Sequence, residues 1–152
     1  MDSSDVLYES DGPIAIITLN RPQYRNAQSY AMLDQLDRAL DWGVEDPAIR
    51  VVIVRGAGGN FSSGHDLGTP ESILDRERRA IDANSVDDYN AFRHYNLDLN
   101  LKWRNLPKPT IAMVEGYCIF GGWMIAASMD LVFAAPDALF LAGLVEYFSI
   151  PW

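Results

Sequence analysis

Residues 110–130 constrain the fold of this chain more than any other part of the sequence. The stretch opens with an apolar run rich in β-branched residues, passes Gly116, and continues through Gly121 and Gly122 into a run with almost no polar side chain. This order predicts a strand, a glycine-rich turn and a buried helix. Glycines at a helix start leave backbone N–H groups uncovered where the helix dipole is positive, so a developing oxyanion would be stabilised there. Alternatively, the glycines serve only close packing of strand and helix.

A second predicted strand leads into a similar turn. Residues 51–55 form a continuous apolar run that ends in an arginine, which is typical of a buried parallel strand. The glycine-rich residues 56–60 follow, and after them comes the segment 61–67. Two strands of the chain are therefore each expected to end in a glycine-rich turn.

Three motifs in the sequence are similar to those of one family. Residues 61–67, Phe-Ser-Ser-Gly-His-Asp-Leu, resemble the Phe-x-x-Gly-x-Asp-Leu signature of the crotonase superfamily, also called the enoyl-CoA hydratase/isomerase family. Residues 111–130 resemble its second signature, an apolar strand, Gly-Tyr, Gly-Gly, a helix and Asp. Asn-Arg-Pro at 20–22 with Arg-Asn-Ala at 25–27 resembles a third. The motifs follow the family's order and cover nearly the whole chain up to about Leu141.

This resemblance implies an α/β fold, the crotonase-like (ClpP/crotonase) spiral of ββα units. We expect residues 1–152 to form one such domain, incomplete at its C-terminal end because family members continue well beyond the position of Trp152. The missing part normally supplies helices that close the acyl pocket and make trimer contacts. The resemblance therefore implies a homo-oligomer, a trimer or hexamer, when the full-length domain is present.

Composition and charge limit the partners of the chain. Its 152 residues, 49% of them apolar, suit one domain with a real core. No apolar run reaches the roughly 18 to 20 residues that span a bilayer, and the first residues lack the pattern of a signal peptide, so we expect a cytoplasmic protein without membrane contact. A net charge of -9 argues against nucleic acid as a partner. It leaves room for a phosphorylated ligand held locally by a few arginines.

Cysteine and histidine usage does not favour a metal site. The single cysteine, Cys118, excludes an internal disulfide and a cysteine-based metal cage. It is either a small buried hydrophobic residue or a nucleophile beside the glycine turn. His65 and His94 lack the helical spacing of metal ligands. We expect no metal and no cofactor, with coenzyme A entering as part of the substrate.

The remaining elements follow from local patterns. Apolar runs at 6–9 and 14–19, separated by Asp-Gly-Pro, predict a hairpin. Ser29 is suited to cap a helix that ends before Pro47, so that the strand at 51–55 completes a βαβ crossover.

The part of the chain between residues 67 and 107 divides into two. The charged residues 69–86 suggest a solvated excursion over the site. From Val86 to Pro107 the pattern is helical, and an aromatic and apolar stripe at this spacing is expected to face the core. The stripe consists of Tyr89, Phe92, Tyr95, Leu99, Trp103 and Leu106.

The chemistry that the resemblance implies uses two backbone amides to bind the thioester carbonyl oxygen of an acyl-CoA. The donors carried over are the N–H of His65, which follows Gly64, and the N–H of Gly121. Charge moves onto the oxygen as the transition state gains enolate character, so each preorganised donor contributes roughly 3 kcal/mol. The imidazole of His65 is not required by this scheme.

The resemblance also implies contacts to the rest of the ligand. The segment that contains Arg21 and Arg25 borders the adenosine and phosphate end of coenzyme A, and residues after the first oxyanion donor line the CoA and acyl path. The positions implied to contact substrate or CoA are Arg25, Ala27, Gly64, Asp66, Leu67, Gly68 and Met124.

The sequence departs from the family at both acid/base positions. Hydratases of the family carry one glutamate three residues beyond the oxyanion glycine, where this chain has Met124, and a second one that aligns near Leu144. Neither residue transfers a proton. Glu146 is the nearest carboxylate and the candidate base, although reaching the second position requires a shift of two residues.

The resemblance favours the first of three functions, an acyl-CoA-binding enzyme of the enoyl-CoA hydratase/isomerase type. The first is hydration of a 2-enoyl-CoA or a shift of its double bond, with another enolate reaction as a variant. The second is a non-catalytic acyl-CoA-binding pseudoenzyme or fragment, in which Met124 would face the thioester. The third, a hydrolase built on Ser63 and His65, lacks the Gly-x-Ser-x-Gly elbow.

Overall fold

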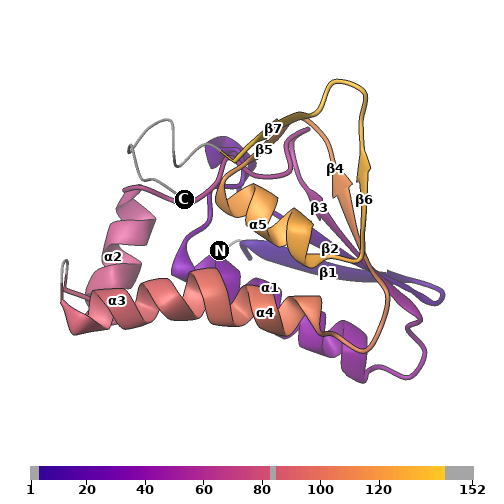
Figure 1. Ribbon diagram of the computed structural model, residues 1–152, viewed down its shortest axis with the longest axis horizontal. Coiled ribbons are helices and arrows are strands. Elements are labelled where there is room, and N and C mark those ends of the chain that lie inside the picture. Colours follow the sequence, from indigo (N-terminus) through magenta and orange to yellow (C-terminus); the bar gives the residue numbers. More distant parts are fainter. Residues whose placement is uncertain (1–3, 83–84, 143–152) are drawn as a thin grey trace.

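The computed structural model describes residues 4–82 and 85–142 as an α/β fold around one mixed sheet (Figure 1). The order of its strands is β1-β2-β3-β4-β6. These strands are β1 (Val6–Asp11), β2 (Ile14–Leu19), β3 (Val51–Gly56), β4 (Thr110–Val114) and β6 (Leu131–Ala134). A second, two-stranded sheet consists of β5 (Tyr117–Ile119) and β7 (Leu139–Leu141).

The order of the strands follows the chain. β1 and β2 form the predicted antiparallel hairpin, with Val6 paired to Leu19 and Asp11 to Ile14. β2, β3, β4 and β6 are parallel to one another, so each step between them is a crossover that contains helix. The carboxyl ends of β3 and β4 therefore lie at the same edge of the sheet, which brings together the two glycine-rich turns that follow them.

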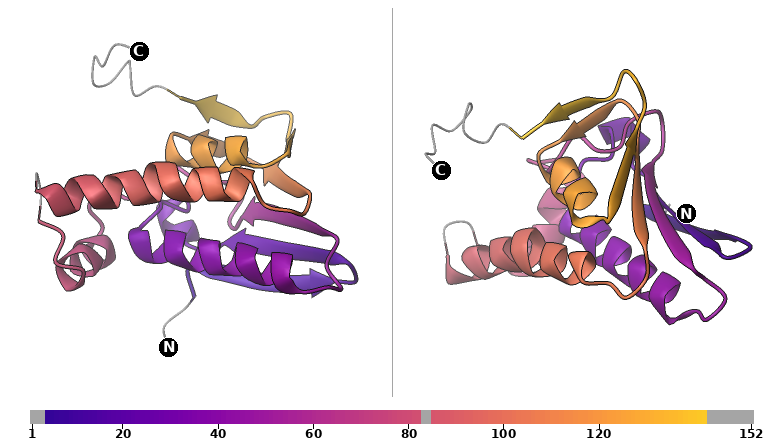
Figure 2. Two further views of the ribbon diagram at one scale, coloured as in Figure 1. Left: turned by 60° about the horizontal axis from the view of Figure 1, so that its bottom comes forward. Right: turned by 45° about the vertical axis from the view of Figure 1, so that its right-hand side comes forward.

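Helices cover one side of the sheet. They are α1 (Tyr30–Glu45), α2 (Pro70–Arg78), α3 (Val86–Arg93), α4 (Leu99–Arg104) and α5 (Gly121–Ser128), with short helical turns η1 (Pro22–Tyr24) and η2 (His94–Asp98). α1 packs on the first three strands, α5 packs on β4 and β5, and α4 lies between α1 and α5 (Figure 2). None of the helices in the described ranges combines the length and apolar character needed to cross a membrane.

The helix predicted after Ser29 is confirmed. The side chain of Ser29 accepts a hydrogen bond from the backbone N–H of Met32, which satisfies one of the uncapped donors of the first turn. The helix ends at Glu45, two residues before Pro47. Its buried face consists of Met32, Leu33, Leu36, Ala39, Leu40 and Gly43.

The predicted excursion after residue 69 contains a helix, α2. Thr69 caps this helix through its side chain and Pro70 occupies the first turn, a combination that starts helices. Arg79, just past its end, donates hydrogen bonds to Asp75 at 2.8 Å and to the hydroxyl of Tyr95 at 2.6 Å, and pairs with Asp34 of α1 at 2.8 Å. The charged residues therefore fasten this segment to the core.

The helix predicted from Val86 is confirmed, but it contains one π-helical turn. The backbone N–H of Leu99 donates to the carbonyl oxygen of His94, five residues earlier, so α3, η2 and α4 form one continuous helix. A π turn holds an extra residue, which rotates the faces before and after it relative to each other. The expectation of a single buried stripe is wrong in its first part: Tyr89 and Phe92 are 64% and 60% exposed, because α3 does not pack closely against the elements that bury α4.

The core lies between the sheet and α1, α4 and α5. Its largest fully buried side chains include Trp103, Phe61, Ile17, Leu36 and Ile125. Cys118 belongs to this core, and burial raises the pKa of its thiol to about 12. The thiol therefore stays protonated, as a buried hydrophobic residue would, and does not provide a nucleophile.

Replacement of a core leucine tests this packing. Leu36 is fully buried, whereas Leu67 is 93% exposed. We expect Leu36→Ala to lower the free energy of unfolding by about 2–5 kcal/mol, because it leaves a cavity. The same change at Leu67 should shift it by less than about 0.5 kcal/mol. Urea unfolding followed by circular dichroism measures both values, and equal losses would contradict the described core.

Candidate active site

The turns that follow β3 and β4 are joined through backbone hydrogen bonds. The N–H of Ser62 donates to the carbonyl of Tyr117 at 2.8 Å, and the N–H of Ile119 donates to the carbonyl of Ser62 at 2.9 Å. The hydroxyl of Ser62 is buried and donates to the carbonyl of Asn26 at 2.8 Å. The 25–27 motif, the 61–67 motif and the second glycine turn therefore meet at one place.

Gly64 brings the first turn close to the start of α5. Its φ of +97° is strained for residues with a side chain, and a Cβ atom there would lie 3.0 Å from the carbonyl oxygen of Ile119 and 3.6 Å from the backbone nitrogen of Gly121. Phe120, which precedes the helix, also has a positive φ of 53°. Such strain in non-glycine residues is concentrated at functional sites.

Two backbone donors are left uncovered at this junction. Gln28 and His65 form a parallel bridge in which Gln28 bonds to the neighbours of His65: its N–H donates to Gly64 at 2.8 Å, and its carbonyl accepts from Asp66 at 2.9 Å. The N–H of His65 therefore faces away from Gln28. Gly121 is the first residue of α5. Within residues 4–82 and 85–142, neither amide donates a hydrogen bond.

The side chain of His65 lies against Gly121. A Cβ atom on Gly121 would lie 2.7 Å from Cε1 and 2.9 Å from Nδ1 of the imidazole, and it would also collide with Oε1 of Gln28. Burial lowers the pKa of His65 below its usual value, so the ring is neutral at pH 7. Residues 64, 65 and 121 are thus close neighbours in the structure.

A cavity of about 240 Å³ opens beside the imidazole. Its walls come from the start of α1, the loop after β3, α2 and the α3–η2 helix. The lining residues are Gln28, Ser29, Tyr30, His65, Asp66, Leu67, Ser72, Arg76, Phe92 and Asn96. Of the predicted contact residues, Asp66 and Leu67 line this cavity, whereas Gly68 and Met124 are not among its lining residues.

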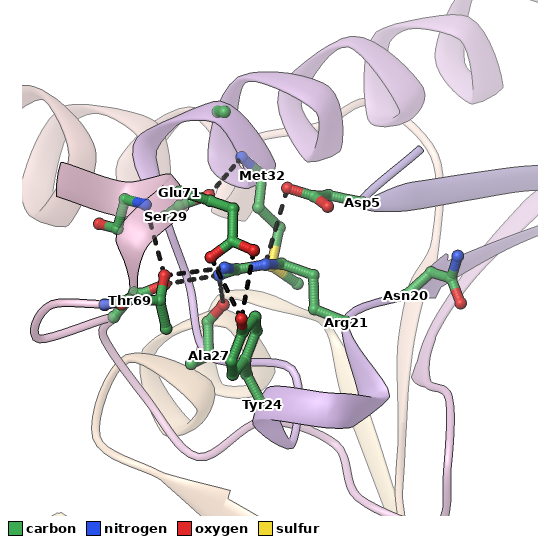
Figure 3. Close-up of polar contacts among 12 residues, drawn as sticks. Asp5, Asn20, Arg21, Tyr24, Ala27, Ser29, Met32, Thr69 and Glu71 are labelled. Carbon is green, nitrogen blue, oxygen red and sulfur yellow. Dashed lines mark hydrogen bonds and ion pairs between the residues drawn. The ribbon is translucent and has the colours of Figure 1, made fainter. Parts of the chain in front are cut away.

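Asp66 forms a buried ion pair that could not be predicted from the sequence. Its carboxylate pairs with Arg21 at 2.8 Å, with side chains 1% and 3% exposed, and accepts hydrogen bonds from Thr69 and the N–H of Gly68. Arg21 also bonds to the carbonyl of Ala27 and to Thr69 (Figure 3). Burial alone would raise the pKa of Asp66, but the hydrogen bonds to its carboxylate outweigh this effect and lower the pKa below its usual value. The carboxylate therefore stays charged.

The predicted residues of the coenzyme end occupy different environments. Arg25 is exposed, and its guanidinium carbon lies 5.2 Å from the centre of the Tyr117 ring. Ala27 is partly buried and contributes its carbonyl to Arg21 at 2.6 Å. Arg25 therefore presents an accessible cation, whereas Ala27 helps to hold the buried ion pair in place.

The predicted acid/base positions carry no proton donor in the described residues. Met124 is partly buried in the first turn of α5. Leu144 and the candidate base Glu146 lie outside the described residues. Ser63 donates its hydroxyl to the carbonyl of Tyr24 at 3.2 Å and makes no hydrogen bond to His65 there, so the structure does not support a Ser63–His65 hydrolase.

Sequence analysis missed several polar residues of the cavity wall, among them Gln28 and Asn96. Gln28 directly follows the Arg-Asn-Ala motif, so its position beside a family motif was an available signal. Asn96 lies in the π-helical turn, which no pattern in the sequence indicated. In residues 4–82 and 85–142, no group of three or more His, Cys, Asp or Glu side chains is arranged to hold a metal ion.

The fold and these joined turns define a crotonase-type α/β protein, and comparison with known proteins agrees. The sequence matches the family Enoyl-CoA hydratase/isomerase over residues 9–151, and the chain belongs to that family. The resemblance and the fold class predicted from the motifs are thereby confirmed.

Individual relatives cover the chain almost completely. EchA13 of Mycobacterium tuberculosis is 38% identical to this chain, over 97% of the chain and 53% of the relative. The enoyl-CoA hydratase EchA19 of the same organism is also 38% identical, over 90% and 48%. The crystal structure of an enoyl-CoA hydratase/isomerase from Xanthobacter autotrophicus Py2 superposes with a TM-score of 0.78 at 38% identity, over 90% and 48%. The chain thus spans about half the length of these relatives.

The buried Arg21–Asp66 pair predicts a large loss of stability when it is broken. Asp66→Ala should lower the free energy of unfolding by about 3–5 kcal/mol, because it leaves the buried guanidinium without its partner. Asp98→Ala removes one member of the exposed pair Arg93–Asp98 and should cost no more than about 1 kcal/mol. Urea unfolding compares the two, and a similar small loss in both variants would contradict the structural role of Asp66.

Proposed function

We propose that this chain binds an acyl-CoA thioester and stabilises an enolate through the N–H groups of His65 and Gly121. The observation that carries the proposal is the junction of the two turns, where these amides lie in contacting residues and have no acceptor among the described residues. The amide of Gly121 also lies at the start of α5, where the helix dipole adds positive potential.

The physical basis is the movement of charge during the reaction. A thioester carbonyl oxygen is nearly neutral in the ground state and carries most of the negative charge of an enolate. Fixed donors therefore bind the transition state more strongly than the substrate, by about 3 kcal/mol each. The reaction class proposed is hydration of a 2-enoyl-CoA or shift of its double bond, in keeping with the name of the relative EchA19.

The rest of the ligand is proposed to follow the polar rim of the site. Leu67 and Gly68 are exposed beside the cavity and would contact the CoA arm, and Arg25 would supply a cation for the phosphates. Glu146 of the C-terminal segment is the carboxylate candidate for the base where no group of the cavity wall fills that role. We further propose a cytoplasmic protein that forms a trimer or hexamer when the domain is complete.

Two substitutions at Gly121 distinguish the effect of losing its backbone N–H from the steric effect of adding a Cβ atom. Gly121→Ala keeps the N–H but adds a Cβ that meets His65 and Gln28. Gly121→Pro adds a Cβ as well and also removes the N–H, at a first-turn position that accepts proline. We expect the proline variant to lose at least about 100-fold more kcat/KM for crotonyl-CoA than the alanine variant.

The measurements are loss of the enoyl-thioester absorbance of crotonyl-CoA and calorimetric binding of butyryl-CoA, with circular dichroism as the check on folding. The parent chain should bind butyryl-CoA more tightly than free CoA. Equal activity of the two folded variants would rule out the Gly121 donor. Binding of butyryl-CoA without any turnover in the parent chain would favour the non-catalytic acyl-CoA-binding protein.

A further inference from the structure

Two polar groups in the wall of the cavity have no protein partner in the described part of the chain. One is the imidazole of His65, which makes a ring contact with Phe120 at 6.3 Å between centroids and packs against Gly121. The other is Oδ1 of Asn96, which is fully buried and accepts no hydrogen bond there. The amide nitrogen of the same side chain does have a partner, because it donates to the carbonyl of Phe92 at 2.9 Å. A buried oxygen without a donor is costly, so each such group requires an explanation.

The position of Asn96 depends on the π-helical turn. Residues 94–98 form the π turn, and Asn96 is its central residue. Such turns are uncommon inside α-helices and are frequent at functional sites, because they re-aim side chains at the expense of regular hydrogen bonding. Here the turn belongs to the helix that carries both Phe92 and Asn96 of the cavity wall.

The other titratable and charged groups that face the cavity are already engaged. Asp66 pairs with Arg21 at 2.8 Å, and Arg76 of α2 pairs with Asp88 at 2.7 Å. The hydroxyl of Tyr30 at the start of α1 accepts a hydrogen bond from Arg76 at 3.0 Å. The neutral imidazole of His65 is the group left to accept a proton among these lining residues.

We propose that the imidazole of His65 is the proton carrier of this site and that the Oδ1 atom of Asn96 orients the water. The proposal rests on the proposed function, because the N–H of the same His65 holds the thioester oxygen there. Since Cα of an acyl thioester is one bond from the carbonyl carbon, a base attached to an oxyanion residue is close to the atoms that exchange protons. His65 thereby takes the role of the glutamate that hydratases of the family carry at the position of Met124.

The hydration step then balances as follows. A water molecule donates one hydrogen to a ring nitrogen of His65 and the other to Oδ1 of Asn96, which leaves a lone pair for Cβ of the enoyl thioester. As the C–O bond forms, the imidazole takes the water proton, the alkene electron pair becomes the double bond between Cα and the carbonyl carbon, and the carbonyl π pair moves onto the thioester oxygen, held by the N–H of His65 and Gly121. The imidazolium returns the proton to Cα as the carbonyl reforms, so one water has added across the double bond.

The test of the proton carrier compares two histidine substitutions. His65→Gln keeps the backbone N–H and should lower kcat for crotonyl-CoA by about 100-fold or more, the range typical of a lost general base. Its dissociation constant for butyryl-CoA should stay within about threefold of the parent value, since the oxyanion donor remains. His94→Gln makes the same change on an exposed helix position and should alter neither quantity.

The pH profile and isotope exchange give readouts that a structural role would not move. In the parent chain log kcat should fall with unit slope below a pKa that lies under 6.5, because burial lowers the pKa of His65, and His65→Gln should abolish this step. The parent chain should also exchange the α-hydrogens of butyryl-CoA in D2O, as detected by mass spectrometry. His65→Gln should lose this exchange.

The role of Asn96 is tested by rescue. Asn96→Leu removes the oxygen and should lower kcat with little change in KM, whereas Asn96→Asp keeps an oxygen in place and should recover activity. Asn105→Leu is the matched control, because Asn105 makes the same bond to the carbonyl four residues earlier at an exposed position. It should leave activity unchanged.

The outcomes separate this inference from the proposed function. Binding of butyryl-CoA together with full activity or exchange in His65→Gln overturns the proton carrier and leaves the oxyanion site intact. Binding without hydration or exchange in the parent chain also overturns it. Absence of butyryl-CoA binding in the parent chain overturns the proposed function itself, and the proton carrier with it.

Discussion

Backbone hydrogen bonds between Ser62 and the strand β5 hold the two glycine-rich turns of this protein together. They set the first turn against Ile119 and Gly121, and the left-handed conformation of Gly64 allows the close approach. The parallel sheet makes this contact possible, because β3 and β4 end at the same edge. Without it, the amides of His65 and Gly121 would belong to two separate loops.

Charged residues near the site mainly stabilise the structure. The buried Arg21–Asp66 pair fixes the loop beside the cavity, and Arg79 links α2 to α1 through Asp34. These bonds pair the charged side chains close to the cavity. Among the described residues, the neutral imidazole of His65 therefore lies without a partner beside charged groups that have one. An overall charge of -9 is therefore compatible with the proposed binding of an anionic coenzyme, since the local groups and not the net charge would face such a ligand.

Much of the fold could be predicted from the sequence, because apolar periodicity and capping residues act locally. The hairpin, the helix capped by Ser29 and the strands before both turns were all predicted. The short strands β5 and β7 were not, since three residues carry too little pattern, and the π turn at residues 94–98 left no local signal. The two backbone donors could be predicted because they belong to sequence motifs. The position of Asn96 in the cavity wall could not, because it depends on tertiary packing.

The amides of His65 and Gly121 are proposed to bind the thioester carbonyl oxygen. The most direct test is the infrared carbonyl stretch of butyryl-CoA labelled with carbon-13 at the thioester carbonyl, recorded free and bound to this chain. Hydrogen bonds from preorganised donors polarise the carbonyl, so the account predicts a shift to lower wavenumber on binding. A bound ligand whose carbonyl stretch stays at its value in water or moves to higher wavenumber would contradict binding of the oxygen by these two amides.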